Sequence, residues 1–358
     1  MAANQDLFDL SEDLVMSLPY LSVVIPFRND DYSENALEKF NFSLKLLIGQ
    51  LEENRIAAEI IIVDWNSPDF EHPLINEIRI RKNSEYVSVV VYEIDSSVHC
   101  NYRGHEVRNL VGEVAFNVGI RRSRGNFVVG KVSDTFYSSR LISLIAQRRL
   151  VNEYVYRVDR VDVNSQFPVP KDWERHFEKN IVVRKSSPRG SIHVKACGDF
   201  LLMSRNKWFS IRGFPEVDSV VHHGSDGEAL HAAIGAGARQ EYLAPEACIY
   251  KLSHSGMYNS RVSTRKRKGG RFKGAFLGEM DRHLAQKFIV VVVRLVLGLM
   301  NLPGTRISNI KTRSIYRYYL VANFRRIFWG GGFLKSDDWG LRDLALTPKC
   351  VTKANWED

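Results

Sequence analysis

A chain of 358 residues with 44% hydrophobic side chains is long enough for one large domain or two, each with an apolar core. It contains no low-complexity segment and no repeat of solenoid or propeller length, which excludes those architectures. Residues 1–15 are acidic and polar and lack the apolar stretch of a secretory signal, which predicts a cytoplasmic protein. The four cysteines are widely spaced without a C-x-x-C motif, which argues against structural zinc and for reduced thiols.

The formal net charge of +9 is unevenly distributed along the chain. Residues 261–330 hold sixteen Lys and Arg against two acids, Glu279 and Asp281, whereas the rest of the chain is weakly acidic. The basic character therefore concerns the contacts of the C-terminal third and not those of the whole protein.

Strands and helices alternate in the first part of the chain. Four short apolar runs predict buried strands, at 21–27, 59–64, 86–94 and 127–132. Apolar residues from Leu37 to Ile48 recur at helical spacing after the first strand, with Ser33 or Asn35 as the cap, and 113–123 forms a further helix. This alternation predicts βαβ units and a mainly parallel sheet of the α/β class.

The remaining elements extend this pattern to residue 254. In chain order they are a helix near 138–150, a strand at 153–162, a polar loop at 164–190 with three prolines, a strand at 196–205, helices at 208–213 and 227–236, and a strand ending at His254.

Two of the predicted strands end in a carboxylate, Asp64 and Asp134. Ligands of open α/β sheets bind in the crevice at the carboxyl ends of the strands, so both residues are candidates for a binding site. Capping of the following turn is the alternative for each Asp.

The order of several short motifs resembles nucleotide-sugar glycosyltransferases of the A-type (GT-A) fold, particularly the family 2-like bacterial enzymes. The matching segments are 22–28, 59–67, 116–125, 127–134, 198–205 and 212–216, within a resemblance that covers about residues 20–255. The resemblance implies a Rossmann-like mixed, mainly parallel sheet flanked by helices. The expected division is an N-terminal extension (1–19), a GT-A domain (20–258) with a nucleotide-binding half (20–136) and an acceptor half (137–258), and a basic, mostly helical C-terminal extension (259–358).

The resemblance implies a hexosyltransferase-like enzyme that moves a sugar from a nucleotide diphosphate donor to a hydroxyl of a glycan or glycolipid. In the family, an Asp-x-Asp motif holds a divalent cation, Mn²⁺ or Mg²⁺, against the donor diphosphate. Here the motif is Val132-Ser133-Asp134, so the first Asp is replaced and metal dependence is left open. His254 is the second metal-ligand candidate, with a structural role as its alternative. The donor-binding residues implied are Pro26, Phe27, Arg28, Asp64, Asn117, Arg121, Arg122, Ser133 and Asp134.

The candidate catalytic base is Asp226, at the start of the helix 227–236. An inverting single displacement needs a carboxylate that takes the proton of the acceptor hydroxyl. Helix capping is the alternative role for this residue, and Glu228 is the reserve candidate for the base. The acceptor-side candidates are Asp199, His223, Arg157 and Asp159, and the alternative for Arg157 and Asp159 is a structural ion-pair ladder.

The basic third suggests a partner surface of its own. The apolar run between Lys287 and Asn301 is shorter than the ~20 residues of a membrane span. It is either a core helix or an interfacial helix, with 261–300 on an anionic membrane surface at the inner face of the cell membrane. Nucleic acid is disfavoured because no binding motif is present. Residues 337–344 resemble a tail segment of related transferases and are expected to fold back on the domain.

Two functions of other classes remain as alternatives. Val132 and Ser225 depart from the acidic motifs of the family, which is consistent with a catalytically impaired GT-A-like binding protein. The basic third is consistent with a scaffold on membranes or nucleic acid.

Overall fold

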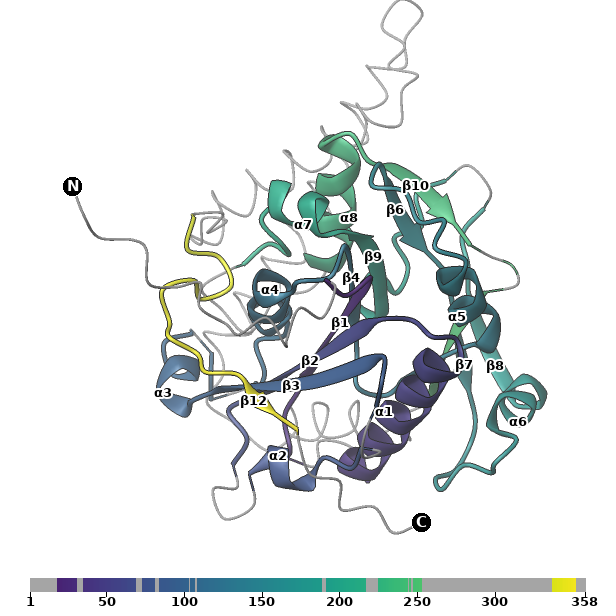
Figure 1. Cartoon of the computed structure of the whole chain (residues 1–358), viewed down its shortest axis with the longest axis horizontal. Helices are drawn as coiled ribbons and strands as arrows, with labels where there is room; N and C mark the ends of the chain where they lie inside the picture. Colours follow the sequence, from purple (N-terminus) through teal and green to yellow (C-terminus); the bar gives the residue numbers. More distant parts are fainter. Residues whose placement is uncertain are drawn as a thin grey trace, which may run out of the picture.

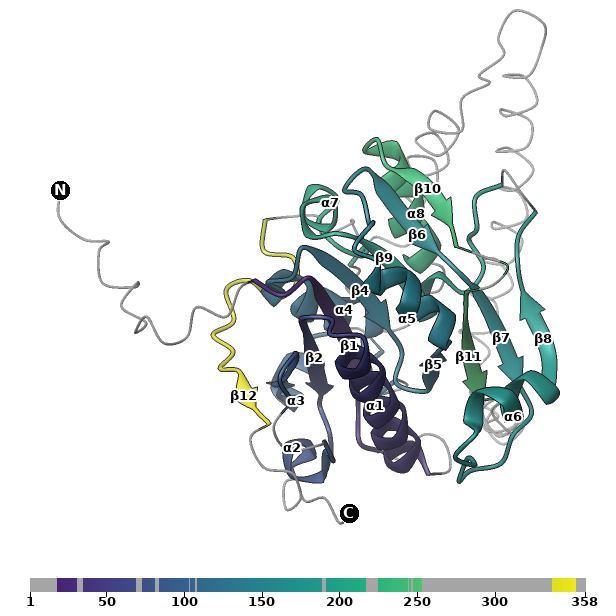
Figure 2. The ribbon, with the colours of Figure 1, turned by 45° about the vertical axis from the view of Figure 1, so that its right-hand side comes forward.

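The structure is a computed structural model of the 358-residue chain, shown in Figures 1 and 2. It describes residues 18–30, 35–68, 73–80, 84–102, 104–106, 108–188, 191–216, 225–243, 245, 247–252 and 337–351.

The centre of the molecule is a sheet in the strand order β10-β6-β9-β4-β1-β2-β3-β12. Its strands are β1 (Leu21–Phe27), β2 (Ala58–Trp65), β3 (Val87–Ile94), β4 (Phe127–Lys131), β6 (Tyr154–Arg157), β9 (Phe200–Ser204), β10 (Arg239–Tyr242) and β12 (Lys349–Cys350). β3, β2, β1 and β4 are parallel neighbours, whereas β9 and β12 run antiparallel to theirs. The predicted α/β fold with a mainly parallel sheet is confirmed.

A second, smaller sheet has the order β5-β11-β7-β8 and stands beside the first (Figure 2). It contains β5 (Thr135–Tyr137), β7 (Asp159–Val163), β8 (Ile181–Lys185) and β11 (Cys248–Leu252). The predicted strand 153–162 is therefore two strands in two sheets, β6 and β7, which Val158 separates. β4 and β5 also belong to different sheets, so the turn that contains Asp134 joins the two.

Helices cover both faces of the central sheet (Figure 1). α1 (Ala36–Glu53) and α5 (Ser139–Ala146) lie on one face, and α4 (Gly112–Arg122), α7 (Arg205–Ser210) and α8 (Ser225–Gly235) lie on the other. The alternation of side chains along a strand explains this arrangement. Val23 and Ile25 of β1 pack in the core with α1, whereas Val24 packs in the core with α4.

The predicted loop 164–190 contains two elements that the sequence did not reveal, α6 (Trp173–Lys179) and strand β8. Trp173 and Phe177 of α6 are buried and pack with Phe136 and Tyr250 in a third apolar cluster. Prediction of a loop was wrong here because two aromatic side chains, set among polar residues, are enough to anchor a short helix to the second sheet. The other short helices are α2 (Leu74–Glu77), α3 (Ser96–His99) and the 3₁₀ helix η2 (Cys197–Asp199).

Residues 337–351 pack on the central sheet, although they lie in the extension predicted for 259–358. Trp339 is buried, with 4% of its surface exposed, and β12 pairs with the outer strand β3. The expected return of the segment 337–344 to the domain is therefore found in the structure.

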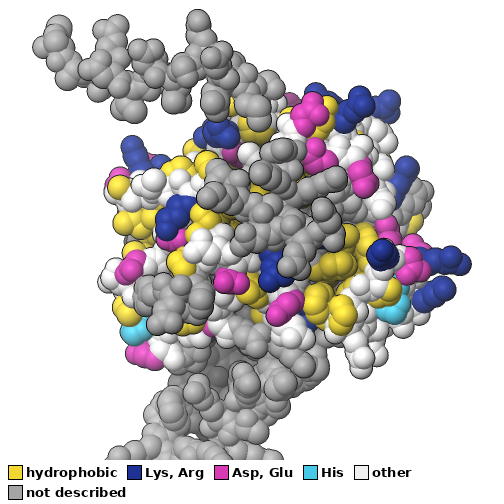
Figure 3. All heavy atoms as spheres, turned by 60° about the horizontal axis from the view of Figure 1, so that its bottom comes forward, with side chains coloured by type: hydrophobic (Ala, Val, Ile, Leu, Met, Phe, Trp, Pro, Cys, Tyr) yellow, Lys and Arg dark blue, Asp and Glu magenta, His cyan; other side chains and the backbone are white. Residues whose placement is uncertain are grey.

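The predictions for residues 1–17 and 253–336 lie outside the described residues, and so do His223 and His254. Among the described helices, none has the length and apolar character needed to cross a membrane. The strongly basic segment 261–330 lies outside the part of the chain that the structure describes. On the face drawn in Figure 3, the acidic and basic side chains of the described residues are interspersed rather than gathered by sign.

Candidate functional site

Asp134 lies at the carboxyl end of β4, in the turn between the two sheets, and only 4% of its surface is exposed. Strand β11 pairs antiparallel with β5 so that Lys251 stands opposite Thr135. This register brings Nζ of Lys251 to 3.2 Å from Oδ1 of Asp134. The predicted site residue Asp134 therefore has a lysine ammonium as its neighbour.

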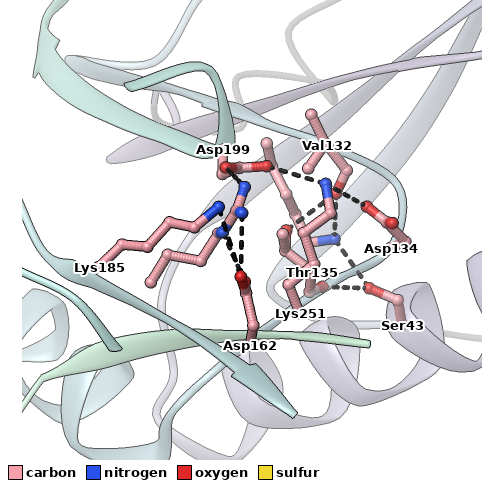
Figure 4. Close-up of polar contacts among 10 residues, drawn as sticks. Ser43, Val132, Asp134, Thr135, Asp162, Lys185, Asp199 and Lys251 are labelled. Atoms are coloured by element: carbon pink, nitrogen blue, oxygen red, sulfur yellow. Dashed lines mark hydrogen bonds and ion pairs between the residues drawn. The ribbon is translucent and has the colours of Figure 1, made fainter. Parts of the chain in front are cut away.

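Lys251 also reaches Asp199 of η2, whose Oδ1 lies 3.1 Å from the same ammonium (Figure 4). Burial opposes the charge of Lys251, but Asp134 and Asp199 outweigh it and raise the pKa of the ammonium above its ordinary range. Lys251 therefore carries its charge at neutral pH and joins two predicted carboxylates, Asp134 and Asp199.

Two further cations, Arg160 and Lys185, extend this network of charges. Arg160 of β7 binds Asp199, and its Nε lies 2.8 Å from Oδ1 of Asp162. Nζ of Lys185 lies 3.3 Å from Asp162 at the rim of the network (Figure 4). The carboxylates of Asp199 and Asp162 are thus shared between cations, an arrangement that offsets the cost of burying each charge alone.

Lys131, the last residue of β4, is almost fully buried, with 1% of its surface exposed. Its Nζ donates to the hydroxyl of Ser43 in α1 (2.8 Å) and to the carbonyl of Val132 (3.1 Å). Burial lowers the pKa of Lys131 to about 7, although Asp134 acts in the opposite direction. Sequence analysis missed both Lys131 and Lys251; for Lys131, the signal was a basic residue at the end of an apolar strand.

Asp226 lies in the first turn of α8 and contacts η2. Its Oδ2 accepts a hydrogen bond of 2.8 Å from the backbone N–H of Gly198, the residue before Asp199. The structure therefore links three predicted site residues through η2 and Lys251: Asp134, Asp199 and Asp226.

A second polar cluster forms where β1 and β2 end. Asp64 is buried at the end of β2 and accepts a hydrogen bond from the hydroxyl of Ser67. Arg28 follows β1, donates to the carbonyl of Asn66, and forms an ion pair of 2.8 Å with Asp30. Burial raises the pKa of Asp64 to about 6; Glu93 adds to this effect, whereas Ser67 and Arg28 oppose it. The structure thus brings Arg28 and Asp64 together at the strand ends, as a shared ligand would require.

Five predicted donor-binding residues have other contacts in the structure. Phe27 is buried in the core and stacks on Phe40 with ring centroids 4.3 Å apart. Pro26 is buried within β1, where it stands beside Val63 of β2. Both side chains therefore support the end of β1, and their predicted contact with the donor stays a prediction.

Asn117, Arg121 and Arg122 of α4 hold other segments of the protein. Nδ2 of Asn117 donates to the carbonyl of Phe214 and to Glu216, each at 2.8 Å. Arg121 and Arg122 donate to backbone carbonyls in the C-terminal segment, at Trp339, Gly340, Leu341 and Leu344. These side chains anchor loops to α4, and their predicted contacts with the donor stay a prediction.

The acceptor-side residues Arg157 and Asp159 are both buried, and Asp159 forms an ion pair with Arg184, in keeping with the alternative of a structural ion-pair ladder. Arg157 donates to the carbonyls of His193 (3.1 Å) and Lys195 (2.8 Å). Asp159 accepts hydrogen bonds from Tyr242 and Arg184. Burial opposes ionisation of Asp159, but its hydrogen-bond donors prevail and lower its pKa.

The donor set around Asp134 does not fit a divalent cation. Within the described ranges, no group of three or more His, Cys, Asp and Glu side chains is arranged to hold a metal ion. Val132 stands where the family motif has a carboxylate, and Asp134 forms an ion pair with a cation, Lys251. Hard divalent cations need several oxygen ligands of which one or more are anionic. His254, the other predicted ligand, lies outside the described residues.

Comparisons with known proteins give similarity to solved structures alone. No protein-family model matches this chain, and no curated protein matches it. The crystal structure of S. aureus TarS 1–349 is similar with a TM-score of 0.42 and 18% identity, over 67% of this chain and 62% of that chain. The same protein in complex with UDP gives a TM-score of 0.41 and 16% identity, over 65% and 60% of the two chains.

A third solved structure is the mannosyltransferase PcManGT from Pyrobaculum calidifontis, in complex with GDP-Man and Mn²⁺. It is similar with a TM-score of 0.41 and 14% identity, over 88% of each chain. This chain thus spans less than two thirds of the TarS chain and most of the mannosyltransferase. Similarity of this size assigns no function to the chain.

Proposed function

We propose that this protein is a glycosyltransferase that moves a sugar from a nucleotide diphosphate donor to a hydroxyl group of a glycan or glycolipid. The observation that carries the proposal is the link between Asp134, at the carboxyl end of β4, and Asp226, at the start of α8. Lys251 joins Asp134 to Asp199, and the N–H of Gly198 joins η2 to Asp226. Carboxyl ends of strands in an open α/β sheet are the usual place for such a ligand site.

The donor nucleotide is assigned to the cluster at the ends of β1 and β2. Asp64 supplies a carboxylate acceptor for base N–H groups, and Arg28 supplies a cation on the facing loop. The motifs 22–28 and 59–67, which resemble the nucleotide-binding segments of the GT-A family, end at these two residues. This supports a donor that lies across the carboxyl ends of β1, β2 and β4.

The transfer is proposed to be an inverting single displacement with Asp226 as the general base. The acceptor oxygen forms a bond to the anomeric carbon of the sugar while its proton passes to the Asp226 carboxylate. The bond between the anomeric carbon and the diphosphate oxygen breaks, and its electron pair leaves with the nucleoside diphosphate. The N–H of Gly198 donates to Oδ2 of Asp226 and the N–H of Gly227 donates to Oδ1, each at 2.8 Å, which orients the carboxylate and leaves a lone pair on each oxygen for the acceptor proton.

The test is release of free nucleoside diphosphate from a panel of nucleotide-sugar donors. We expect Asp226→Asn to lower turnover by about 10²- to 10⁴-fold while donor affinity stays within a few-fold, because only the proton transfer is lost. Glu228→Gln is the matched control on the same helix, and it should retain turnover. Unchanged turnover in Asp226→Asn would refute the base assignment, and loss in Glu228→Gln alone would transfer it to that residue.

The setting is proposed to be synthesis of a surface polysaccharide or glycolipid in the cytoplasm, with 261–300 on an anionic membrane at the inner face. The sixteen basic residues of 261–330 support this, since each Lys or Arg near an anionic surface contributes about 1 kcal/mol. Flotation with liposomes that contain anionic lipid tests the proposal. Deletion of 261–300 should abolish flotation, and unchanged flotation would contradict the membrane partner.

A second candidate function is nucleotide-sugar binding without turnover, which Val132 favours because it replaces the first acid of the family motif. Calorimetric titration with UDP and GDP separates the two functions. Binding without diphosphate release from any donor would support the binding protein. Release that depends on Asp226 would support the enzyme.

A further inference from the structure

The turn after β4 contains a substitution and a compensating charge. Val132 removes a carboxylate from the position before Asp134, so one anionic ligand is absent from the motif. The pairing of β5 with β11 places Lys251 opposite Thr135, and its ammonium lies against Asp134. The turn therefore lacks one negative charge of the family motif and has a positive charge, Lys251, beside the remaining carboxylate.

The ammonium of Lys251 holds both carboxylates that line this turn. It lies 3.2 Å from Asp134 and 3.1 Å from Asp199, and Arg160 takes the other oxygen of Asp199. A divalent cation at Asp134 would displace an ammonium ion, which would then be left beside a second positive charge in a largely buried network. Moving a buried charge away from its partner is costly.

Lys251 is nevertheless accessible to a ligand. The exposed fraction of its side chain is 18%, compared with 6% for Asp134. An ammonium has three protons, and the carboxylates of Asp134 and Asp199 account for two of them among the described residues. An anionic oxygen that reached the turn could accept the third.

We propose that Lys251 supplies the positive charge that faces the donor diphosphate, so that the protein binds and transfers its donor without a divalent metal ion. The inference rests on the proposed glycosyltransferase function and deepens it. Asp134 and Asp199 position the ammonium, which neutralises charge on the diphosphate as the bond to the sugar breaks. Lys131 places a second amino group behind the same turn, hydrogen-bonded to Ser43 and to the carbonyl of Val132.

The first experiment uses the wild-type protein and therefore does not depend on how a variant folds. Affinity for UDP and GDP is measured by calorimetry, and diphosphate release is measured with the donor panel, each in EDTA and in added Mn²⁺ or Mg²⁺. We expect the nucleotide affinity in EDTA to lie within about two-fold of the affinity with added metal ions, and we expect the same of the turnover. A requirement for Mn²⁺ or Mg²⁺ in either measurement would overturn the inference while leaving the glycosyltransferase function intact.

The second experiment compares Lys251→Met with Lys171→Met. Lys171 is exposed and lies outside the network described above, so it controls for loss of one positive charge. We expect Lys251→Met to lower nucleotide affinity and to lower turnover by about 10²-fold or more, as loss of one charge-stabilising donor does. Lys251→Arg should restore part of the nucleotide affinity, a rescue that a purely structural role in the turn would not predict.

The outcomes separate the inference from the proposed function. Lys251→Met with wild-type nucleotide affinity and turnover would overturn the inference alone. Wild-type protein that neither binds UDP or GDP nor releases diphosphate, with or without metal ions, would overturn the glycosyltransferase function and the inference with it.

Discussion

Oε1 of Glu216 accepts a hydrogen bond of 2.8 Å from the backbone N–H of Gly340, a residue 124 positions later in the chain. The same oxygen accepts a hydrogen bond of 2.8 Å from Asn117 of α4. One buried carboxyl group thus joins the loop after α7, helix α4 and the C-terminal segment 337–351.

Glu216→Gln should stabilise the protein in neutral and alkaline solution. Burial raises the pKa of Glu216 from 4.5 to about 7, whereas the hydrogen bonds from Asn117 and Gly340 oppose the shift. The folded state therefore holds a proton that the unfolded state releases, so stability falls as pH rises between these two values, by at most about 1.4 kcal/mol per pH unit. Glutamine keeps the acceptor and carries no charge.

Urea unfolding of wild type and Glu216→Gln across a pH series provides the measurement. The unfolding free energy of the variant should rise relative to that of the wild type as pH rises from about 5 to about 7. Above that pH the difference should stay constant. A difference in unfolding free energy that is the same at every pH would rule out an ionising Glu216 as its cause.

Arg122→Met should release the C-terminal segment from α4. Arg122 donates to the carbonyls of Gly340, Leu341 and Leu344, and a hydrogen bond from a charged group contributes about 1.5–3 kcal/mol. We expect faster amide exchange in 337–351 and a loss of about 2–3 kcal/mol in unfolding free energy. Arg149→Met, at an exposed site, is the control and should leave both unchanged. Unaltered protection of 337–351 in Arg122→Met would contradict the anchoring role.

Nucleotide affinity should fall in acid solution because of Asp64. The pKa of this carboxyl is raised to about 6, chiefly by burial, so it gains a proton below that pH and no longer offers a carboxylate to a base N–H. Calorimetric titration with UDP and GDP should show affinity that declines as pH drops through about 6. Asp64→Asn should bind more weakly and lose this pH dependence, and an unchanged pH profile in the variant would remove Asp64 from the binding site.

Gly119→Ala should destabilise the contact between α4 and β1. A Cβ atom at Gly119 would lie 2.3 Å from Cγ1 of Val24, within the packed core, and overpacking of this kind costs about 1–3 kcal/mol. Gly49→Ala in α1 is the matched control, since its Cβ would meet nothing within 4 Å. The control should be neutral or up to about 1 kcal/mol more stable, because alanine favours the helix. Thermal unfolding of both variants checks the pair, and equal midpoints would contradict the close packing.

Local sequence patterns were sufficient to predict the central sheet. The apolar runs of β1 and β2 are nearly continuous because these strands are buried on both faces, whereas buried and partly exposed residues alternate along much of β3. Helices α1 and α4 present regular apolar stripes to the sheet. Asp64 and Asp134 were found from the same runs, since each follows the end of one. Local patterns predict a strand and the residue at which it ends, and both carboxylates stand at such an end.

Tertiary pairing determines the rest of the site, and local patterns do not contain it. Lys251 meets Asp134 because β11 pairs with β5 across the second sheet, a contact between distant parts of the chain. Arg121 and Arg122 were predicted to contact the donor, and in the structure they donate to the returning C-terminal segment, which the local pattern does not reveal. The predicted loop 164–190 concealed α6 because Trp173 and Phe177 alone supply its apolar face.

The short strand β12 has a consequence for the order in which the protein matures on the ribosome. Nζ of Lys349 bonds to Glu93, 256 positions earlier, beside the pairing of β12 with β3. Until those last residues have been synthesised, β3 presents an unpaired edge to its surroundings, the kind of edge that recruits foreign strands. A ribosome that stalls before residue 349 would therefore leave a nascent chain in which β3 lacks its pairing with β12. We expect chaperones to bind such a chain.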